Sequence, residues 1–170
     1  MKYINVYRLW ILILFPIIIN CQNRIFKDKL SLILDVNNVK IKKSLSIDEF
    51  GGFGEGYTFE VYKLSEKTIK SFIVNPSKSI RYNNDSTWVK KDWDKAPIDT
   101  IYNEVLLMCL NYDSGSKKLT NKLLEIKKSL TRTNVYYALY YRPDKYNPQD
   151  AQLFVLDIES KNLYIIESNF

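Results

Sequence analysis

The C-terminal part of the chain is dominated by three runs of β-branched and aromatic residues. They are NVYYALYY at 134–141, AQLFVLDI at 151–158 and LYIIESNF at 163–170. Such runs, separated by turn-forming segments, are typical of strands in a folded sheet. Only ESKN stands between the last two runs, and a connection that short joins antiparallel neighbours. The pattern predicts an antiparallel sheet at this end of the chain.

Two segments in the middle of the chain have helical periodicity. Apolar residues recur at helical spacing from Ile98 to Tyr112, and Gly115 ends this segment. Its run at 105–110 is apolar on all sides, which favours a central helix. In residues 117–130 apolar positions recur every three or four residues and lysines fill the other face. That second pattern is typical of an amphipathic surface helix.

The first half of the chain mixes extended and helical patterns. Leucines occupy alternate positions at the start of 30–41, which favours a strand or extended chain. YTFEVYKL at 57–64 is a clearer strand pattern, and a short helix is expected from Ser65 to Phe72. Prolines, asparagines and serines in 75–97 predict a long loop.

Together these patterns predict an α+β fold. We expect an antiparallel sheet of about four to six strands, with two main helices packed on one face. A length of 170 residues fits one domain, and no internal repeat or long linker divides the chain.

The N-terminus has the organisation of a secretory signal. Lys2 and Arg8 are basic, no acidic residue accompanies them, and residues 9–19 form an unbroken apolar run. A helix that spans a bilayer needs about 20 apolar residues, whereas the apolar core of a signal peptide needs about 7–15. The length of this run therefore favours a signal peptide.

The apolar run leads into Ile18-Ile19-Asn20-Cys21, which resembles the lipobox of bacterial lipoproteins. In that family a diacylglycerol is attached to the Cys thiol, and cleavage makes this Cys the first residue. The resemblance implies lipidation of Cys21 and anchoring to a membrane of the bacterial cell envelope, on the periplasmic or outer-membrane face. Asn20 departs from the family, which usually has Gly, Ala or Ser there. An uncleaved anchor and an ordinary signal peptide are the alternatives.

Cleavage before Cys21 would divide the chain into a signal peptide at 1–20, a tether at 21–28 and a single domain at 29–170. Loss of residues 1–20 lowers the formal net charge from +6 to +4. This small excess suits an anionic membrane surface better than nucleic acid, and export separates the domain from nucleic acids and nucleotides. The expected partners are the membrane, through the lipid, and a protein or envelope component.

The chain contains no histidine. This excludes a Ser-His-Asp triad, a Cys-His pair and histidine metal sites. Two cysteines cannot form a Cys-rich zinc site, and acylation of Cys21 would leave Cys109 without a disulfide partner. Because Cys109 lies on the apolar stripe of its helix, we expect a buried, inert thiol. No catalytic residue, metal or cofactor is predicted.

Four of the five glycines lie close together, at Gly51, Gly52, Gly54 and Gly56. A phosphate-binding loop uses glycines to converge backbone N–H groups on an anion, usually at a helix start. Here the loop leads into a strand, and Glu55 would repel phosphate. We expect a structural turn or bulge with at least one glycine at positive φ. The segment is similar to a GGFxGxG segment of small uncharacterised bacterial proteins, and this resemblance implies no activity.

The long predicted loop carries Tyr82, Trp88 and Trp93, which could stack on a sugar or peptide ligand. Alternatively, the tryptophans pack the loop onto the core. Asp92 and Asp94 flank Trp93, and a carboxylate pair could act as the acid and base of a hydrolase. Solvated loop carboxylates are the alternative.

The leading hypothesis is a non-enzymatic, membrane-tethered lipoprotein domain that binds a protein or envelope component. One alternative is a small envelope hydrolase that uses Asp92, Asp94 or Glu55. Another is an immunity or inhibitor protein against a toxin. A hydrolase requires a cleft with converging carboxylates, at least one of them with a raised pKa. A binding domain does not.

Overall fold

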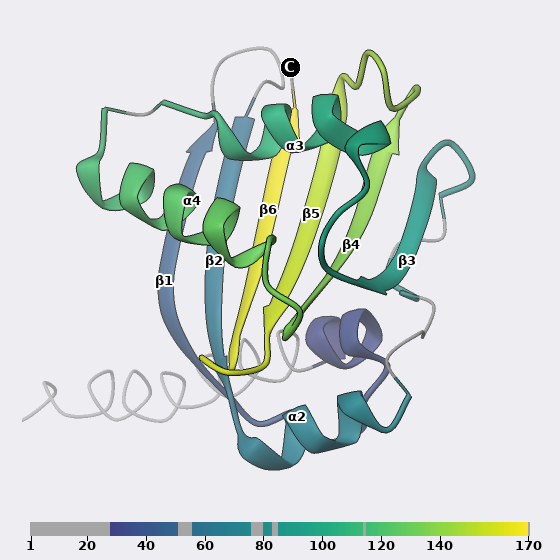
Figure 1. Ribbon diagram of the computed structural model, residues 1–170, viewed down its shortest axis with the longest axis vertical. Coiled ribbons are helices and arrows are strands. Elements are labelled where there is room, and N and C mark those ends of the chain that lie inside the picture. The colour runs from purple at the N-terminus through teal and green to yellow at the C-terminus, as the bar shows by residue number, and fades with distance from the viewer. Residues whose placement is uncertain (1–27, 51–55, 76–79, 83–84, 114, 170) are drawn as a thin grey trace, which may run out of the picture.

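The computed structural model describes residues 28–50, 56–75, 80–82, 85–113 and 115–169. Six strands form one antiparallel sheet in the order β1-β2-β6-β5-β4-β3 (Figure 1). The strands are β1 (Ile41–Phe50), β2 (Gly56–Leu64), β3 (Val89–Lys95), β4 (Val135–Arg142), β5 (Asp150–Asp157) and β6 (Asn162–Asn169). The predicted α+β architecture with an antiparallel sheet is confirmed.

The three C-terminal strands form a meander at the centre of the sheet. The β5–β6 hairpin closes where Asp157 opposes Asn162, which confirms the short antiparallel connection. β4 pairs with the other side of β5, from Val135 opposite Asp157 to Arg142 opposite Asp150. The N-terminal hairpin β1–β2 then adds to β6 through β2. The runs that read most clearly as strands are thus the interior strands.

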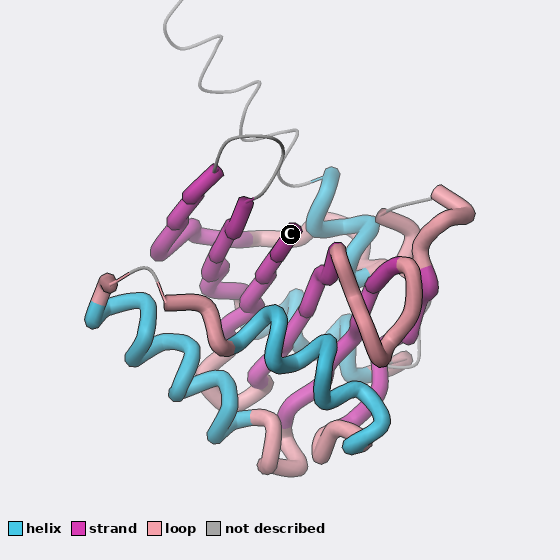
Figure 2. The backbone as a smooth tube through the Cα atoms, turned by 90° about the horizontal axis from the view of Figure 1, so that it is seen from above, coloured by secondary structure: helices cyan, strands magenta, loops and turns pink. Residues whose placement is uncertain are grey.

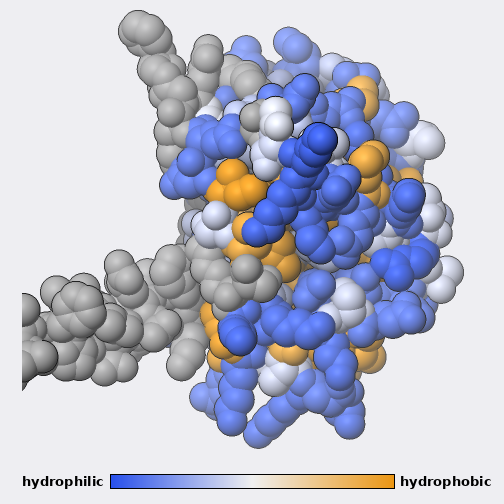
Figure 3. All heavy atoms as spheres, turned by 90° about the vertical axis from the view of Figure 1, so that its left-hand side faces the viewer, coloured by the Kyte–Doolittle hydropathy of each residue, from blue (hydrophilic) through white to orange (hydrophobic). Residues whose placement is uncertain are grey.

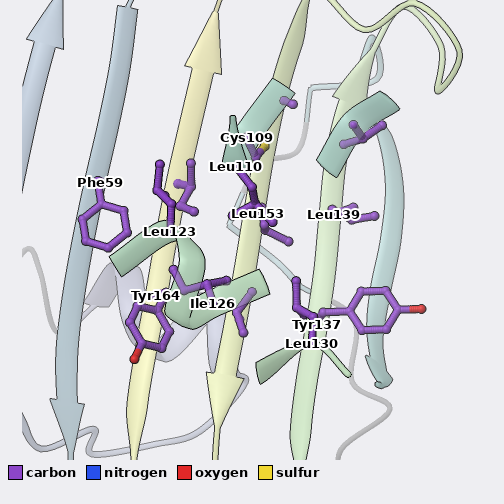
Figure 4. Close-up of a cluster of buried hydrophobic side chains, with 14 of the residues drawn as sticks. Phe59, Cys109, Leu110, Leu123, Ile126, Leu130, Tyr137, Leu139, Leu153 and Tyr164 are labelled. Carbon is purple, nitrogen blue, oxygen red and sulfur yellow. The ribbon is translucent and has the colours of Figure 1, made fainter. Parts of the chain in front are cut away.

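Two helices cover one face of the sheet, as expected. They are α3 (Asn103–Leu110), preceded by the 3-10 turn η2 (Thr100–Tyr102), and α4 (Lys117–Ser129). Figure 1 shows both in front of the strands, with α4 crossing β1, β2 and β6. Ser116 caps α4 by accepting a hydrogen bond from the Leu119 backbone N–H at 3.5 Å. Leu119, Leu123 and Ile126 are buried in the core below, and Figure 4 shows Leu123 and Ile126 pointing toward the strands.

The opposite face carries a second helical layer, which the sequence did not predict. A helix at 28–34 and α2 (Glu66–Ile73) pack there, and Figure 2 shows helical segments on both sides of the strands. The apolar cluster on this face includes Leu30, Phe72 and Phe154. β5 is consequently buried on both faces over almost its whole length.

The expectation of a strand or extended chain at 30–41 was wrong for its first part. Residues 28–34 are helical, and β1 begins only at Ile41. The leucines satisfy alternation, but Leu30, Ile33 and Leu34 also satisfy helical spacing and are all fully buried. Leu32, which alternation would bury, is 44% exposed. Contacts with the sheet decide between two patterns that the local sequence leaves equivalent.

The two edge strands were not predicted. The sequence patterns predict no strand after Ile41, where β1 begins. β3 lies within 75–97, the segment that they predict as a loop. In β3 only Trp93 is buried, and charged residues occupy most other positions. An edge strand with one buried side chain lacks the period-two apolar pattern on which strand prediction depends. Among the described residues, no helix is long and apolar enough to cross a membrane.

Candidate functional site

A hollow of about 500 Å³ lies between α3 and the C-terminal end of α4. Its wall is mostly apolar, with one acidic and one basic residue. The lining residues are Pro97, Ile98, Asn103, Glu104, Leu106, Leu107, Leu110, Lys127, Leu130 and Thr131. Leu110 and Leu130 form part of the buried cluster beneath (Figure 4). The hollow is therefore an opening onto this cluster, which lies between the sheet and helices α3 and α4 and is called the front cluster below.

A second hollow of about 380 Å³ adjoins the first, because Leu110 and Lys127 line both. It follows the loop after α3 and the first turns of α4. Its lining is Leu110, Asn111, Tyr112, Asp113, Thr120, Leu123, Leu124 and Lys127. We call the two hollows together the α3–α4 groove. Leu107 and Leu124, at its borders, are 46% and 48% exposed, so the groove presents apolar surface to solvent.

The C-terminal end of α3 is fixed to the sheet by an aromatic pair. Tyr57 of β2 and Tyr112 stack with centroids 4.0 Å apart and rings within 5° of parallel. The Tyr57 hydroxyl donates to the Cys109 carbonyl oxygen at 2.7 Å, and burial raises the pKa of Tyr57. The Tyr112 hydroxyl donates to Glu49 Oε2 at 2.7 Å, and this hydrogen bond raises the pKa of Tyr112. The floor and one wall of the groove are thus held in place.

Lys127 crosses the groove and ties its two helices together. Its Nζ donates to Asn111 Oδ1, just beyond the end of α3. Lys122 on the same helix instead pairs with Glu125 at 2.6 Å, in an exposed i,i+3 salt bridge. A surface pair of that kind contributes about 0–1 kcal/mol. The charged groups around the groove therefore orient its walls more than they stabilise the fold.

Trp93, one of the three predicted binding aromatics, is a core residue. Its indole Nε1–H donates to the Ile33 carbonyl oxygen at 2.8 Å. Phe72 meets the Trp93 ring edge-on at 5.2 Å, and only 3% of Trp93 is exposed. Trp93 therefore packs its segment onto the core, and its ring has no free face for a ligand.

The other two aromatics, Tyr82 and Trp88, are half-buried on the same side of the sheet. The Arg142 guanidinium carbon lies 4.8 Å from the Trp88 ring centroid, and Lys29 Nζ lies 4.8 Å from the Tyr82 ring. One face of each ring is thus occupied by a cation. The structure does not join Tyr82, Trp88 and Trp93 into one open stacking surface.

Asp92 and Asp94 do not converge. Asp92 Oδ1 accepts from the Ile80 backbone N–H at 3.3 Å, on the side of the second apolar cluster. Asp94 Oδ2 instead lies 2.6 Å from Lys91 Nζ, which sits over the Tyr137 ring of the front cluster. The hydrogen bond from Lys91 lowers the pKa of Asp94. Two exposed carboxylates on opposite faces, one with a lowered pKa, do not form an acid–base pair.

Three glycines of the predicted turn, Gly51, Gly52 and Gly54, lie outside the described residues, as does Glu55. Gly56 is the first residue of β2 and pairs with Phe50 of β1. The glycine segment therefore connects two antiparallel strands. Among the described glycines only Gly115 has a positive φ, at 70°, so the predicted positive φ does not fall at Gly56.

Cys109 is fully buried, and burial raises the pKa of its thiol. It packs in the cluster between the sheet and helices α3 and α4, which confirms the burial that its place on the helix predicted. Within the described parts of the chain, no three Asp, Glu, Cys or His side chains gather as metal ligands would. Cys21 lies outside the described residues.

In comparisons with protein-family models, curated proteins and solved structures, no match to this chain was found.

The sequence did not predict the groove, although one signal was present. The run at 105–110 is apolar on all sides, a pattern that predicts a central helix. In the structure α3 lies on the surface of the sheet, with Val105 and Cys109 buried and Leu107 exposed. A surface helix with more apolar residues than its buried face needs is a signal of an additional contact surface.

Proposed function

We propose that this protein is a non-enzymatic binding domain whose α3–α4 groove holds an apolar segment of a partner protein. A lipid on Cys21 would tether the domain to a membrane of the bacterial envelope. The apolar groove supports the binding role, and the lipobox-like Ile18-Ile19-Asn20-Cys21 supports the tether.

The groove has the features of a protein-recognition surface. Its larger hollow falls within the range of about 300–1,000 Å³ that is usual for ligand sites. Two helices form its sides and apolar side chains its floor, as in grooves that accept the apolar face of a helix or extended segment. Leu107 and Leu124 would lose their exposed apolar surface to the partner, which favours association.

The arrangement of carboxylates favours binding over hydrolysis. Glu104 lines one hollow and Asp113 the other, so the described residues give neither hollow a pair of carboxylates. Asp113 Oδ1 also accepts from the Gly115 backbone N–H at 2.9 Å, within its own loop. Since Asp92 and Asp94 lie on opposite faces of the sheet, they too give a hydrolase no acid–base pair.

Site-specific photo-crosslinking in the native cells tests the binding role. A photoreactive residue at Leu107 should give one discrete protein adduct. The same residue at Val74, which is 86% exposed beside α2 on the other face, is the matched control and should give none. The Leu124→Asp variant should abolish the Leu107 adduct. Equal labelling from both positions, or an adduct that survives Leu124→Asp, would contradict a role for the groove.

The tether is tested separately with Cys21→Ser. The unaltered chain should incorporate labelled fatty acid and sediment with membranes, whereas Cys21→Ser should lose the label. Unchanged mass and labelling would sink the lipoprotein proposal and leave the groove proposal intact. Conversely, equal labelling from Leu107 and Val74 would contradict the groove proposal and leave the lipoprotein proposal intact.

A further inference from the structure

β1 is an edge strand with an unusual distribution of side chains. It pairs with β2 and with no other strand of the described residues, and it forms the left-hand edge of the sheet in Figure 1. Figure 3 views the molecule from this side and shows apolar side chains among hydrophilic ones. An edge strand carries backbone N–H and C=O groups that can pair with a further strand.

The charges of β1 are opposite at its two ends. In the sequence IKKSLSIDEF, lysines occupy positions 42 and 43, and Asp48 and Glu49 lie near the other end. Lys42 and Asp48 are exposed, while Leu45 and Ile47 are half-buried between them. An antiparallel copy of the same strand would bring basic ends to acidic ends.

The register with β2 assigns each β1 position to a face of the sheet. Positions 45, 47 and 49 oppose Val61, Phe59 and Tyr57, whose side chains lie in the front cluster. Tyr62 of β2 lies in the cluster on the other face, and its neighbour Lys63 therefore belongs to the front face. Position 42 opposes Lys63, so it belongs to the front face as well. Positions 43, 46 and 48 belong to the other face. The register shifts between 43 and 45, so position 44 has no partner on β2.

We propose that β1 pairs with β1 of a second copy of this chain, antiparallel, about a two-fold axis at Ser46. Position 44 is skipped against the second copy as it is against β2. Lys42 then opposes the second copy's Glu49, position 43 opposes its position 48, and Leu45 opposes its Ile47. Ser46 opposes its own equivalent on the axis.

Each of these pairs is compatible in face and in chemistry. Residues directly opposite in an antiparallel pair must lie on the same face of the sheet, and all the proposed pairs satisfy this condition. Opposite charges and apolar pairs at such positions stabilise a sheet, whereas like charges destabilise it. Edge lysines and bulges commonly prevent strand addition. In the proposed register each lysine of β1 is opposite an acidic residue of the second copy. A second copy of β1 is therefore accepted at this edge, whereas a strand without acidic residues at those positions is not.

The dimer would have one sheet continuous through both copies, with isologous use of the same strand. It would also carry two α3–α4 grooves and two N-terminal tethers, which favours simultaneous attachment. The pairing depends on β1 alone, and not on the groove or on lipidation.

Disulfide trapping with the full-length chain tests the pairing and its register. In Ser46→Cys, the two equivalent residues would have Cα atoms about 4.5–5.5 Å apart, within the range of about 4.4–6.8 Å that a disulfide allows. Lys42→Cys is the matched control on the same exposed strand, because two equivalent positions there would lie about 20 Å apart. Only Ser46→Cys should give a dimer that reduction reverses.

Charge exchange provides an independent test by sedimentation of the purified chain in detergent. Lys42→Glu sets like charges opposite the second copy's Glu49 at two symmetry-related pairs, and should raise the dimer dissociation constant about ten-fold or more. Lys42→Glu combined with Glu49→Lys restores opposite charges and should return it to within about three-fold of the starting value. Unchanged circular dichroism shows that the variants remain folded.

Each other outcome overturns the proposal. Cross-linking from both positions indicates parallel or unspecific contact, and cross-linking from neither shows that β1 does not pair with itself. A chain that sediments as a monomer at all accessible concentrations contradicts it directly. A dimer that is insensitive to Lys42→Glu uses another surface.

Discussion

The indole N–H of Trp93 donates a hydrogen bond to the carbonyl oxygen of Ile33 at 2.8 Å. This contact joins β3, an edge strand, to the helix at 28–34 across 60 positions of sequence. Phe72 of α2 packs edge-on against the same ring at 5.2 Å. One side chain thus connects the edge of the sheet to both helices of the second helical layer, and two of these three elements, β3 and the 28–34 helix, have weak sequence patterns of their own.

Trp93→Ala should destabilise the fold by about 3–5 kcal/mol, as large-to-small core substitutions of aromatic residues do. The loss combines the cavity, the edge-on contact with Phe72 and the orphaned carbonyl of Ile33. Trp88→Ala is the matched control: because Trp88 is half-buried, the loss should be about 1 kcal/mol. Urea unfolding measures both. Equal losses of unfolding free energy in the two variants would show that Trp93 does not anchor the second helical layer.

Tyr57→Phe should destabilise the fold by about 1–2 kcal/mol. The substitution keeps the ring that stacks on Tyr112 but removes the hydroxyl that donates to the buried Cys109 carbonyl oxygen. Tyr112→Phe removes a more exposed hydrogen bond, to Glu49, and should cost less. Unfolding of the two variants side by side gives the order, and the reverse order would contradict this account of how α3 is held.

The fold should lose stability at alkaline pH because tyrosine hydroxyls are buried. Burial raises the pKa of Tyr164 to about 12 from its ordinary 10.0. A raised folded-state pKa means that stability is fully present below pH 10 and is lost as the pH rises toward 12. Tyr164→Phe should therefore show a smaller loss between about pH 10 and 12 than the unaltered chain. Unfolding curves at several pH values, with tyrosinate absorbance, check this; an equal loss in both would contradict it.

The Cys109 thiol should react with a thiol reagent only when the chain unfolds. Burial raises the pKa of this thiol, so little thiolate is available, and no part of the residue is exposed. In the Cys21→Ser background, the reaction rate should follow the unfolding rate as denaturant is increased. Fast modification without denaturant would mean that α3 opens locally, so that one side of the groove is not fixed.

The sequence predicted those elements in which one local pattern dominated. The β4, β5 and β6 runs, the amphipathic α4 and the short α2 all carry an unambiguous period or a Ser cap, as at Ser65. The helix at 28–34 was missed because its leucines fit two periods equally well. β3 was missed because a single buried side chain, Trp93, supplies its hydrophobic anchor.

The α3–α4 groove could be suspected only from the excess of apolar residues in 105–110. Whether Leu107 is buried depends on how far α3 lies from its neighbours, which no local pattern contains. The three aromatics Tyr82, Trp88 and Trp93 look alike in the sequence. The structure separates them, because only Trp93 lies where the strand, α2 and the 28–34 helix meet.

The sequence by itself determined the fold class, the C-terminal hairpin, the absence of histidine chemistry and the lipobox-like N-terminus that motivates a tether. These follow from local periodicity, turn length and residue identity. Only the tertiary structure decided that both faces of the sheet are covered, that β1 is an edge with complementary ends, and that a groove opens between α3 and α4. Those features depend on contacts between residues far apart in the chain, whose free energies outweigh the small local preferences that a sequence pattern reports.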